Sequence, residues 1–144
     1  MPLSRRDVCS LLPFAVMAGS IASAADAPLA SGFFPFESLA VKQGKGVQIR
    51  SILKGALATG EAVELHETVL EAGAAPHPPH HHKHSEMWLI REGTVEITIN
   101  GKTSQIGPGS AAFVASNEEH GIRNTGTKPA MYFVVAVGPF EAGA

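Results

Sequence analysis

The sequence predicts an all-β fold in which short antiparallel strands close into a double-layered jelly roll or small barrel. Two observations carry this prediction. Segments with strand-like alternation recur at short intervals, and turn-forming residues separate them. The composition agrees, because 15 glycines among 144 residues, with 44% hydrophobic and 17% charged residues, favour a compact domain of short strands. Closing the strands into a barrel removes exposed edges that promote aggregation.

Eight segments with strand-like periodicity follow one another along the chain. They are 47–53, 62–70, 85–91, 94–100, 102–106, 110–115, 120–124 and 130–137. Asn100-Gly101 predicts a two-residue hairpin turn, because both central positions of a type I′ turn need a positive φ angle. Gly107-Pro108-Gly109 marks a further turn. We therefore expect one barrel domain over residues 47–140.

The first 24 residues are expected to be an export signal and not part of the fold. Arg5 and Arg6 precede the apolar stretch 8–17, and Ala22-Ser23-Ala24 suits a signal peptidase. The pattern is similar to a twin-arginine signal and predicts a periplasmic protein, with a general secretory signal as the alternative. The apolar stretch is too short for a stable membrane anchor, which takes roughly 20 residues.

Residues 25–46 are expected to form an extended N-terminal arm that covers the barrel or a neighbouring subunit. Pro35, within the apolar run 33–36, argues against a central strand, because proline lacks the backbone donor that a sheet needs. The charge balance of 11 basic against 13 acidic residues includes no basic patch. Nucleic acid is therefore not an expected partner.

The seven histidines are unevenly distributed, with five of them between residues 77 and 84. His80 and His82 are two residues apart, so in extended backbone they project from the same face and can chelate one ion. Glu86 has the same parity and can add a carboxylate oxygen. A further ligand has to come from elsewhere in the chain, and His120 is the only histidine downstream of the run.

The remaining histidines of the run have open roles. By strand parity, His81 should face away from His80 and His82. His84 shares their parity, so it is either a rival ligand or a group that orients a ligand through a hydrogen bond. His77, His81 and His84 are equally well explained as solvated residues of a His-rich loop.

The spacing of these residues resembles the first motif of the cupin superfamily. That motif consists of a glycine, two histidines separated by one residue, a glutamate after three or four further residues, and a second glycine after six more. The matching residues here are Gly73, His80, His82, Glu86 and Gly93, with Gly73 one residue further upstream than usual.

The second cupin motif is similar to a stretch near His120. Gly109, His120 and Asn124 match it, while Ala115 stands in place of the proline and Asn117 in place of the second glycine. These departures affect the turn and not the ligand. The two motifs cover residues 73–124, and with the strands on both sides the resemblance spans nearly all of the chain after the export signal.

The resemblance implies a double-stranded β-helix that holds one divalent metal ion and keeps coordination positions open for water or substrate. The implied ligands are His80, His82, Glu86 and His120. It also implies a homodimer. Imidazole and carboxylate ligands suit several ions, and Cys9 would be lost with the export signal. Folding before export would reduce competition from copper and zinc, which favours Fe or Mn over Zn, Ni, Co or Cu.

Strand parity also predicts side chains that surround the ion. Trp88 and Ile90 share the face of Glu86 and are expected in the barrel interior. Trp88 either stacks against a substrate or packs the barrel wall. Phe113 is a further candidate for the pocket.

Three other residues are candidates for the pocket on weaker grounds. Ile122 shares the face of His120. His66 lies on a polar strand face that either meets solvent or lines the cavity mouth. Arg50 either clamps a substrate carboxylate or lies at the surface.

The expected function is that of an enzyme acting on a small oxygen-rich organic molecule at the metal. Dioxygenase-like oxidation is favoured, with Glu86 moving a proton. A redox-neutral isomerase, decarboxylase or hydrolase is the nearest alternative. The other class is a metal-dependent protein that binds a small molecule without turnover.

Overall fold

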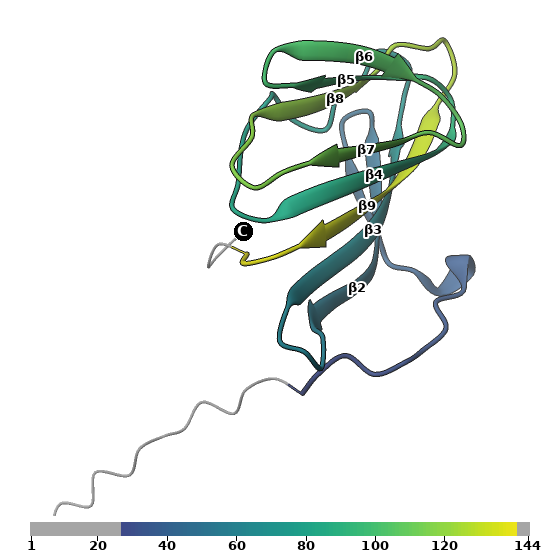
Figure 1. Cartoon of the computed structure of the whole chain (residues 1–144). Coiled ribbons are helices and arrows are strands. Elements are labelled where there is room, and N and C mark those ends of the chain that lie inside the picture. Colours follow the sequence, from purple (N-terminus) through teal and green to yellow (C-terminus); the bar gives the residue numbers. More distant parts are fainter. Residues whose placement is uncertain (1–26, 141–144) are drawn as a thin grey trace, which may run out of the picture.

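A computed structural model describes residues 27–140 of the chain (Figure 1). The predicted export signal, residues 1–24, lies outside the described residues. Antiparallel strands dominate the described part, which confirms the all-β prediction. No helix in residues 27–140 is long and apolar enough to cross a membrane. The elements are η1 (Phe36–Ser38), β1 (Val41–Gly44), β2 (Val47–Ala56), β3 (Ala62–Leu70), β4 (Ser85–Glu92), β5 (Val95–Ile99), β6 (Lys102–Ile106), β7 (Ala111–Val114), β8 (His120–Asn124) and β9 (Ala130–Val137).

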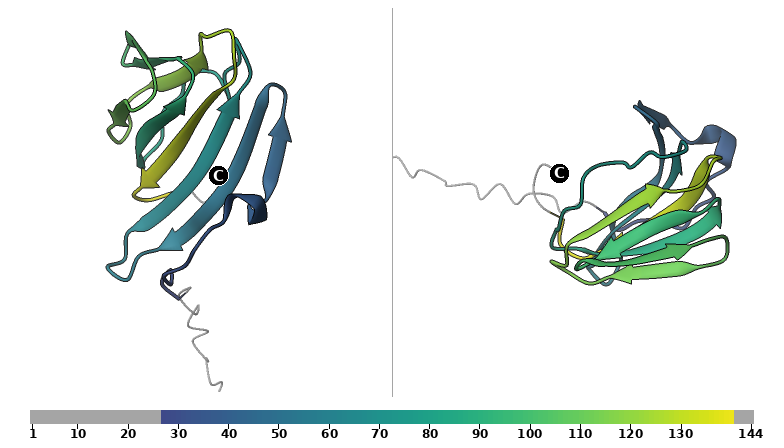
Figure 2. Two further views of the ribbon diagram at one scale, coloured as in Figure 1. Left: turned by 90° about the vertical axis from the view of Figure 1, so that its right-hand side faces the viewer. Right: turned by 90° about the horizontal axis from the view of Figure 1, so that it is seen from above.

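The strands form two sheets that face each other as a jelly roll. The larger sheet has the order β1-β2-β3-β9-β4-β7, and the smaller one has the order β6-β5-β8. In Figure 1 the smaller sheet lies above β7 and β4, and Figure 2 shows the long strands of the larger sheet side by side. All eight segments predicted as strands are present, with ends that differ by a few residues.

The hydrophobic core lies between the two sheets. Strand β9 shows why, since every second residue from Ala130 to Ala136 is buried and the residues between them are only partly buried. The smaller sheet contributes Val95, Ile97 and Ile122 to the same core. The period of two therefore divides each sheet into an inner face, turned towards the other sheet, and an outer face.

Residues with positive φ angles occupy the turns that the sequence marks. Asn100 (φ 48°) and Gly101 (φ 75°) both have positive φ, as predicted for the hairpin between β5 and β6. Asn117, which replaces a motif glycine, has φ 63°, a conformation that asparagine tolerates better than most residues. Gly93 cannot be replaced without strain, because a Cβ atom there would lie 2.6 Å from the Ala130 Cα atom.

The side chain of the motif residue Asn124 forms hydrogen bonds that connect the end of β8 to neighbouring loops. Its buried side chain donates to the carbonyl oxygens of Leu70 (2.9 Å), Glu71 (3.1 Å) and Lys128 (2.8 Å), and it accepts a hydrogen bond from the amide of Gly126 at 2.9 Å. Asn124 is therefore a structural residue, because it satisfies buried backbone groups that would otherwise lack partners.

The predicted arm, residues 25–46, divides into two parts. Residues 41–46 form β1 and its turn, because β1 pairs with β2 as an edge strand instead of continuing as a loop. Residues 27–40 run beside the larger sheet, where the Leu29 amide donates to the Ala56 carbonyl at 2.8 Å. Phe34 and Leu29 lie with Leu65 around a hollow on the outer face of this sheet.

Candidate metal centre

Backbone hydrogen bonds hold the two histidine-bearing segments together. His80 and His120 form an isolated antiparallel bridge, in which each amide donates to the other's carbonyl at 3.0 and 2.8 Å. The amide of Asn117 donates to the carbonyl of His82 at 2.8 Å. Gly121 permits this approach, because a Cβ atom there would lie 3.2 Å from Pro79. The bridge brings the two predicted motifs into one site.

The histidine side chains present nitrogen atoms without partners. His82 Nδ1 is 2.9 Å from the carbonyl oxygen of His84, and His120 Nδ1 is 2.8 Å from that of Glu118. A carbonyl only accepts, so each Nδ1 must carry the proton and each neutral ring keeps a lone pair on Nε2. Within residues 27–140, His80 Nδ1, His82 Nε2 and His120 Nε2 are buried with no hydrogen-bond partner.

Glu86 lies among these nitrogen atoms. Its Oε1 atom is 3.3 Å from His82 Nε2, and its Oε2 atom is 3.8 Å from His120 Nε2. Lone pairs that face a carboxylate at such distances are unfavourable unless a metal cation or a proton lies between them. The indole Nε1 of Trp88 donates to Glu86 Oε2 at 3.1 Å and fixes the carboxylate. This arrangement fits a metal ion, as the donor set does.

Two overlapping groups of three side chains could hold an ion. One is His80, His82 and His120, and the other is His82, His84 and Glu86; in each group the ligand atoms lie within 4.8 Å of one another. Together they contain all four predicted ligands. The second group also contains His84, which the sequence left as a rival ligand or an orienting residue.

His84 is packed against both neighbours. Its ring stacks on that of His82, with centroids 3.5 Å apart and an interplanar angle of 9°. Its Nε2 atom donates to Glu86 Oε1 at 3.3 Å, which favours the orienting role. The other open histidines lie at the surface, where His81 is exposed and His77 packs edge-on against the ring of His80.

Burial keeps several of these rings neutral. It lowers the pKa of His80 to about 4 and also lowers the pKa of His84 and of His120. A neutral imidazole can donate its lone pair to a metal without first releasing a proton. At pH 7 these three rings are therefore in the protonation state that a ligand needs.

A partly open cavity of about 190 Å³ adjoins Glu86. Trp88, Ile122 and His66, which are among the candidate pocket residues, line it. Its lining also includes residues that the sequence did not single out. These are Ile49, Thr68, Pro76, His77, Tyr132 and Val134. Strand parity could have identified Thr68 as a lining residue, because it lies two residues from His66 on the same face of one strand. Tyr132 could not be identified in this way, because its place in the lining depends on the pairing of β3 with β9.

Three predicted pocket residues lie elsewhere. Phe113 is 60% exposed, because β7 pairs with β4 so that Phe113 stands opposite Met87 on the outer face. Arg50 also points outward, where its guanidinium lies 3.3 Å from Glu67 Oε1. Ile90 is buried in the core as expected from its parity, but it does not line the cavity.

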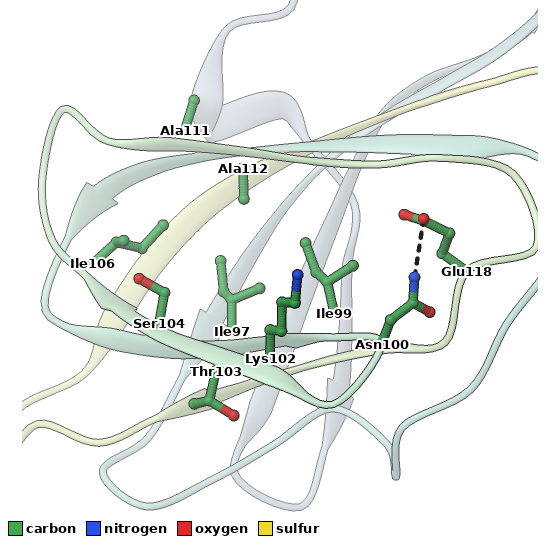
Figure 3. Close-up of a pocket in the computed structure, with 10 residues that line it drawn as sticks. All are labelled: Ile97, Ile99, Asn100, Lys102, Thr103, Ser104, Ile106, Ala111, Ala112 and Glu118. Atoms are coloured by element: carbon green, nitrogen blue, oxygen red, sulfur yellow. Dashed lines mark hydrogen bonds between the residues drawn. The ribbon is translucent and has the colours of Figure 1, made fainter.

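A second hollow of about 460 Å³ opens where the edge strands β6 and β7 face each other (Figure 3). Isoleucines form much of its wall, and its rim carries Lys102 and a hydrogen bond of 2.9 Å from Asn100 Nδ2 to Glu118 Oε1. Its lining contains no histidine. The hollow is therefore separate from the candidate metal centre.

The fold and this cluster define a class of protein, a jelly roll with histidines and a glutamate that could hold a metal ion. Comparison with known protein families gives a match over part of the chain. Residues 66–136 match the family described as Cupin domain. The matched stretch contains residues 73–124, which hold the two motifs that resemble the cupin superfamily.

Solved structures share the fold. KdgF from Halomonas sp. has a TM-score of 0.68 at 16% identity, over 78% of this chain and 97% of that one. A predicted oxalate decarboxylase from Thermotoga maritima has a TM-score of 0.65 at 18% identity, over 75% of this chain and all of that one (100%). Identities this low show the fold alone.

A curated relative matches a shorter stretch. Mannose-1-phosphate guanylyltransferase from Klebsiella pneumoniae is 32% identical over 73 residues, which is 51% of this chain. The matched stretch spans 15% of that relative's length, so the likeness concerns one part of the larger protein.

Proposed function

We propose that this protein is a metal-dependent enzyme that acts on a small oxygen-rich organic molecule. One observation supports this most. Unpartnered nitrogen atoms of His80, His82 and His120 converge, and those of His82 and His120 face Glu86 beside a cavity of about 190 Å³. A cluster that only stabilised the fold would have its buried polar atoms paired.

The proposed ligands are His80, His82, Glu86 and His120. Their nitrogen and oxygen donors suit iron or manganese, and Zn, Ni, Co and Cu remain open on donor type alone. We favour Fe(II) or Mn(II) because a chain that folds before export would acquire its metal where copper and zinc are scarce. Metal analysis of natively exported protein tests this preference, which a predominance of copper or zinc would contradict.

The proposed chemistry is oxidation of the dioxygenase type. The metal, when bound, would align substrate oxygen atoms and act as a Lewis acid. Glu86 would accept a proton from a substrate hydroxyl, since it lines the cavity that would hold the substrate. Trp88 and His84 would keep that carboxylate in place through hydrogen bonds.

Two alternatives use the same cluster. A redox-neutral isomerase, decarboxylase or hydrolase would need the metal as a Lewis acid and no dioxygen. A binding protein would retain its ligand without turnover. Because one fold hosts many reactions, the cupin domain itself does not choose among them.

Metal reconstitution of the full chain distinguishes these candidates. Protein loaded with Fe(II) or with Mn(II) is supplied with diketones, catechols and flavonols, while oxygen uptake and products are followed. Substrate-dependent oxygen uptake that is lost in His82→Ala and kept in His81→Ala is the expected result. Product formation without oxygen uptake would favour the redox-neutral alternative. Tight retention of a compound with no turnover would favour binding.

Export and pairing belong to the same proposal. We propose that residues 1–24 direct the protein to the periplasm, which fractionation of cells expressing Arg5→Lys/Arg6→Lys would test; unchanged export would contradict the twin-arginine route. We also propose a homodimer. The exposed apolar side chains that support it are Phe33, Phe34, Met87, Leu89 and Phe113.

A further inference from the structure

The cavity beside Glu86 has a polar wall that the proposed reaction does not use. His66 and Thr68 are two residues apart on β3, so both point to the inner face. Tyr132 of β9 is the register partner of Thr68. All three side chains line the cavity together with Glu86 and Trp88 of β4. The remaining lining residues on these strands are apolar, so this polar group stands out.

Two of these groups are almost entirely removed from solvent, and the third, His66, is 19% exposed. Thr68 and Tyr132 are each 2% exposed. The Tyr132 hydroxyl is hydrogen-bonded to Thr68, so these two groups pair with each other. His66 Nδ1 is buried with no hydrogen-bond partner, which is unfavourable unless a ligand or water pairs with it. Their common direction towards one cavity therefore indicates a second contact point for a molecule that also reaches the cluster around Glu86.

The wall carries no positive charge. The cavity lining contains neither lysine nor arginine. Lys54, which lies on the same sheet face, is paired with Glu64 Oε2 at 3.0 Å, and Arg50 points to the other face and contacts Glu67. Carboxylate and phosphate groups are normally bound by such cations, often as bidentate pairs with arginine. The wall therefore does not suit an anionic group.

The titratable groups of the wall are themselves uncharged at neutral pH. Burial lowers the pKa of His66, and burial raises the pKa of Tyr132 well above its ordinary value. His66 Nδ1 lies 3.3 Å from Glu64 Oε1 without forming a hydrogen bond to it. Neutral donors and acceptors of this kind match the hydroxyl and carbonyl groups of a ligand.

The cavity is also small. Its volume of about 190 Å³ lies below the range of about 300–1,000 Å³ that is typical of pockets for drug-sized ligands. A long chain or a second ring system would have to extend outside it. The part of the occupant that lies inside the cavity is therefore compact.

We infer that the substrate is a compact, uncharged hydroxy-carbonyl compound with a second polar oxygen, and that His66, Thr68 and Tyr132 bind that second oxygen. The inference rests on the proposed function, because the first oxygens would meet the metal. It adds a substrate class, in which carboxylates and phosphates are disfavoured at the wall. His66, Thr68 and Tyr132 are positioning residues in this assignment.

Three hydroxypyranones test the inference because they share one chelating head and differ in the group at the far end. Kojic acid has a hydroxymethyl group there, comenic acid a carboxylate, and allomaltol a methyl group. Titration calorimetry measures their binding to full-length protein loaded with Mn(II). We expect kojic acid to bind about tenfold more tightly than allomaltol, as one additional hydrogen bond allows. Comenic acid is expected to bind more weakly than kojic acid.

Variants of the wall then separate a contact from a structural role. Tyr132→Phe and Thr68→Val preserve shape, and His66→Gln preserves hydrogen bonding. We expect the two hydroxyl deletions to reduce the preference for kojic acid over allomaltol about fivefold to tenfold, and His66→Gln to retain part of it. Manganese content by elemental analysis and melting by circular dichroism should stay close to wild type in all three.

The outcomes distinguish this inference from the proposed function. Protein that binds manganese but prefers comenic acid, shows no preference, or binds none of the three compounds overturns the inference and leaves the metal site standing. An unchanged preference in Tyr132→Phe and Thr68→Val also overturns it. Wild-type protein that takes up no manganese or iron overturns the proposed function and, with it, the substrate class that rests on it.

Discussion

The two faces of the six-stranded sheet arise from the same alternation of side chains along each strand, but they differ in what they contact. On β4, Trp88 and Ile90 point inward and are almost fully buried, while Met87 and Leu89 point outward and are 38% and 46% exposed. Glu86 shares the inner face and meets the histidine cluster. The outer face instead meets the N-terminal arm along β2, β3 and β9, and stays uncovered along β4 and β7.

The difference between two glutamates shows that burial alone does not mark a functional site. Glu67, on the outer face, is 2% exposed, and its two oxygens lie 3.3 Å from Arg50 and 3.9 Å from Arg91. Glu86, on the inner face, is less buried, and the nitrogen atoms around it come from rings with unpartnered lone pairs. Paired charge indicates structure, whereas convergent unpaired donors indicate a site for an additional group.

The largest effect is expected on the inner face, from removal of a ligand. His120→Ala should weaken binding of Mn(II) or Fe(II) more than about 100-fold, since even residues that only orient a ligand contribute 10–100-fold. His81→Ala is the matched control, because His81 belongs to the same histidine-rich set but is exposed. Titration calorimetry on metal-free protein measures both. Equal metal affinity in the two variants would contradict the assignment of His120.

On the outer face the largest effect should come from the ion pair of Glu67. Arg50→Ala leaves a buried carboxylate with one distant partner, so we expect the free energy of unfolding to fall by about 2–3 kcal/mol. Arg91→Ala is the control, because that side chain is 53% exposed and should contribute less than about 1 kcal/mol. Urea unfolding measures both. Metal affinity should not change in either variant, and a change would show that the two faces are coupled.

Local pattern was enough to predict the strands and the cluster. The ligand positions follow from spacing within a segment, and the inward direction of Trp88 follows from parity relative to Glu86. Phe113 was predicted near the pocket but lies on the outer face, and the place of Arg50 was left open. In both cases parity divides a strand into two faces, but it does not tell which face is the inner one unless a residue on that strand is already placed. Tyr132 was missed because its place depends on the register between two distant strands.

A more moderate effect is expected from Trp88→Phe. Phenylalanine keeps an aromatic ring in the core but loses the hydrogen bond of 3.1 Å from Nε1 to Glu86 Oε2. We expect metal affinity to fall about tenfold, since groups that orient a ligand typically contribute 10–100-fold. Met87→Leu, on the other face of the same strand, is the control. Calorimetry that shows no loss for Trp88→Phe would mean that Glu86 does not need this partner.

Acid should destabilise the metal-free protein through its inner face. His80 has a pKa of about 4 in the folded chain and 6.5 in the unfolded chain, because burial disfavours its charged form. As pH falls below about 6.5, the unfolded chain binds the proton first, so the stabilisation present at higher pH is lost progressively down to about pH 4. Urea midpoints between pH 7 and pH 4 measure this, and His80→Gln should flatten the curve. An equally steep curve in that variant would assign the effect to other groups.

The smallest effect on the fold is expected at Phe33, in the N-terminal arm. Phe33 is 98% exposed, so Phe33→Ser should change the free energy of unfolding of one subunit by less than about 0.5 kcal/mol. If two copies pair through this apolar surface, however, the same substitution should weaken the dimer, which sedimentation equilibrium measures, while metal affinity stays constant. Phe113→Ser tests the uncovered part of the outer face in the same way. A dimer unchanged by both substitutions would contradict pairing through the outer face, and a monomeric wild type would contradict pairing altogether.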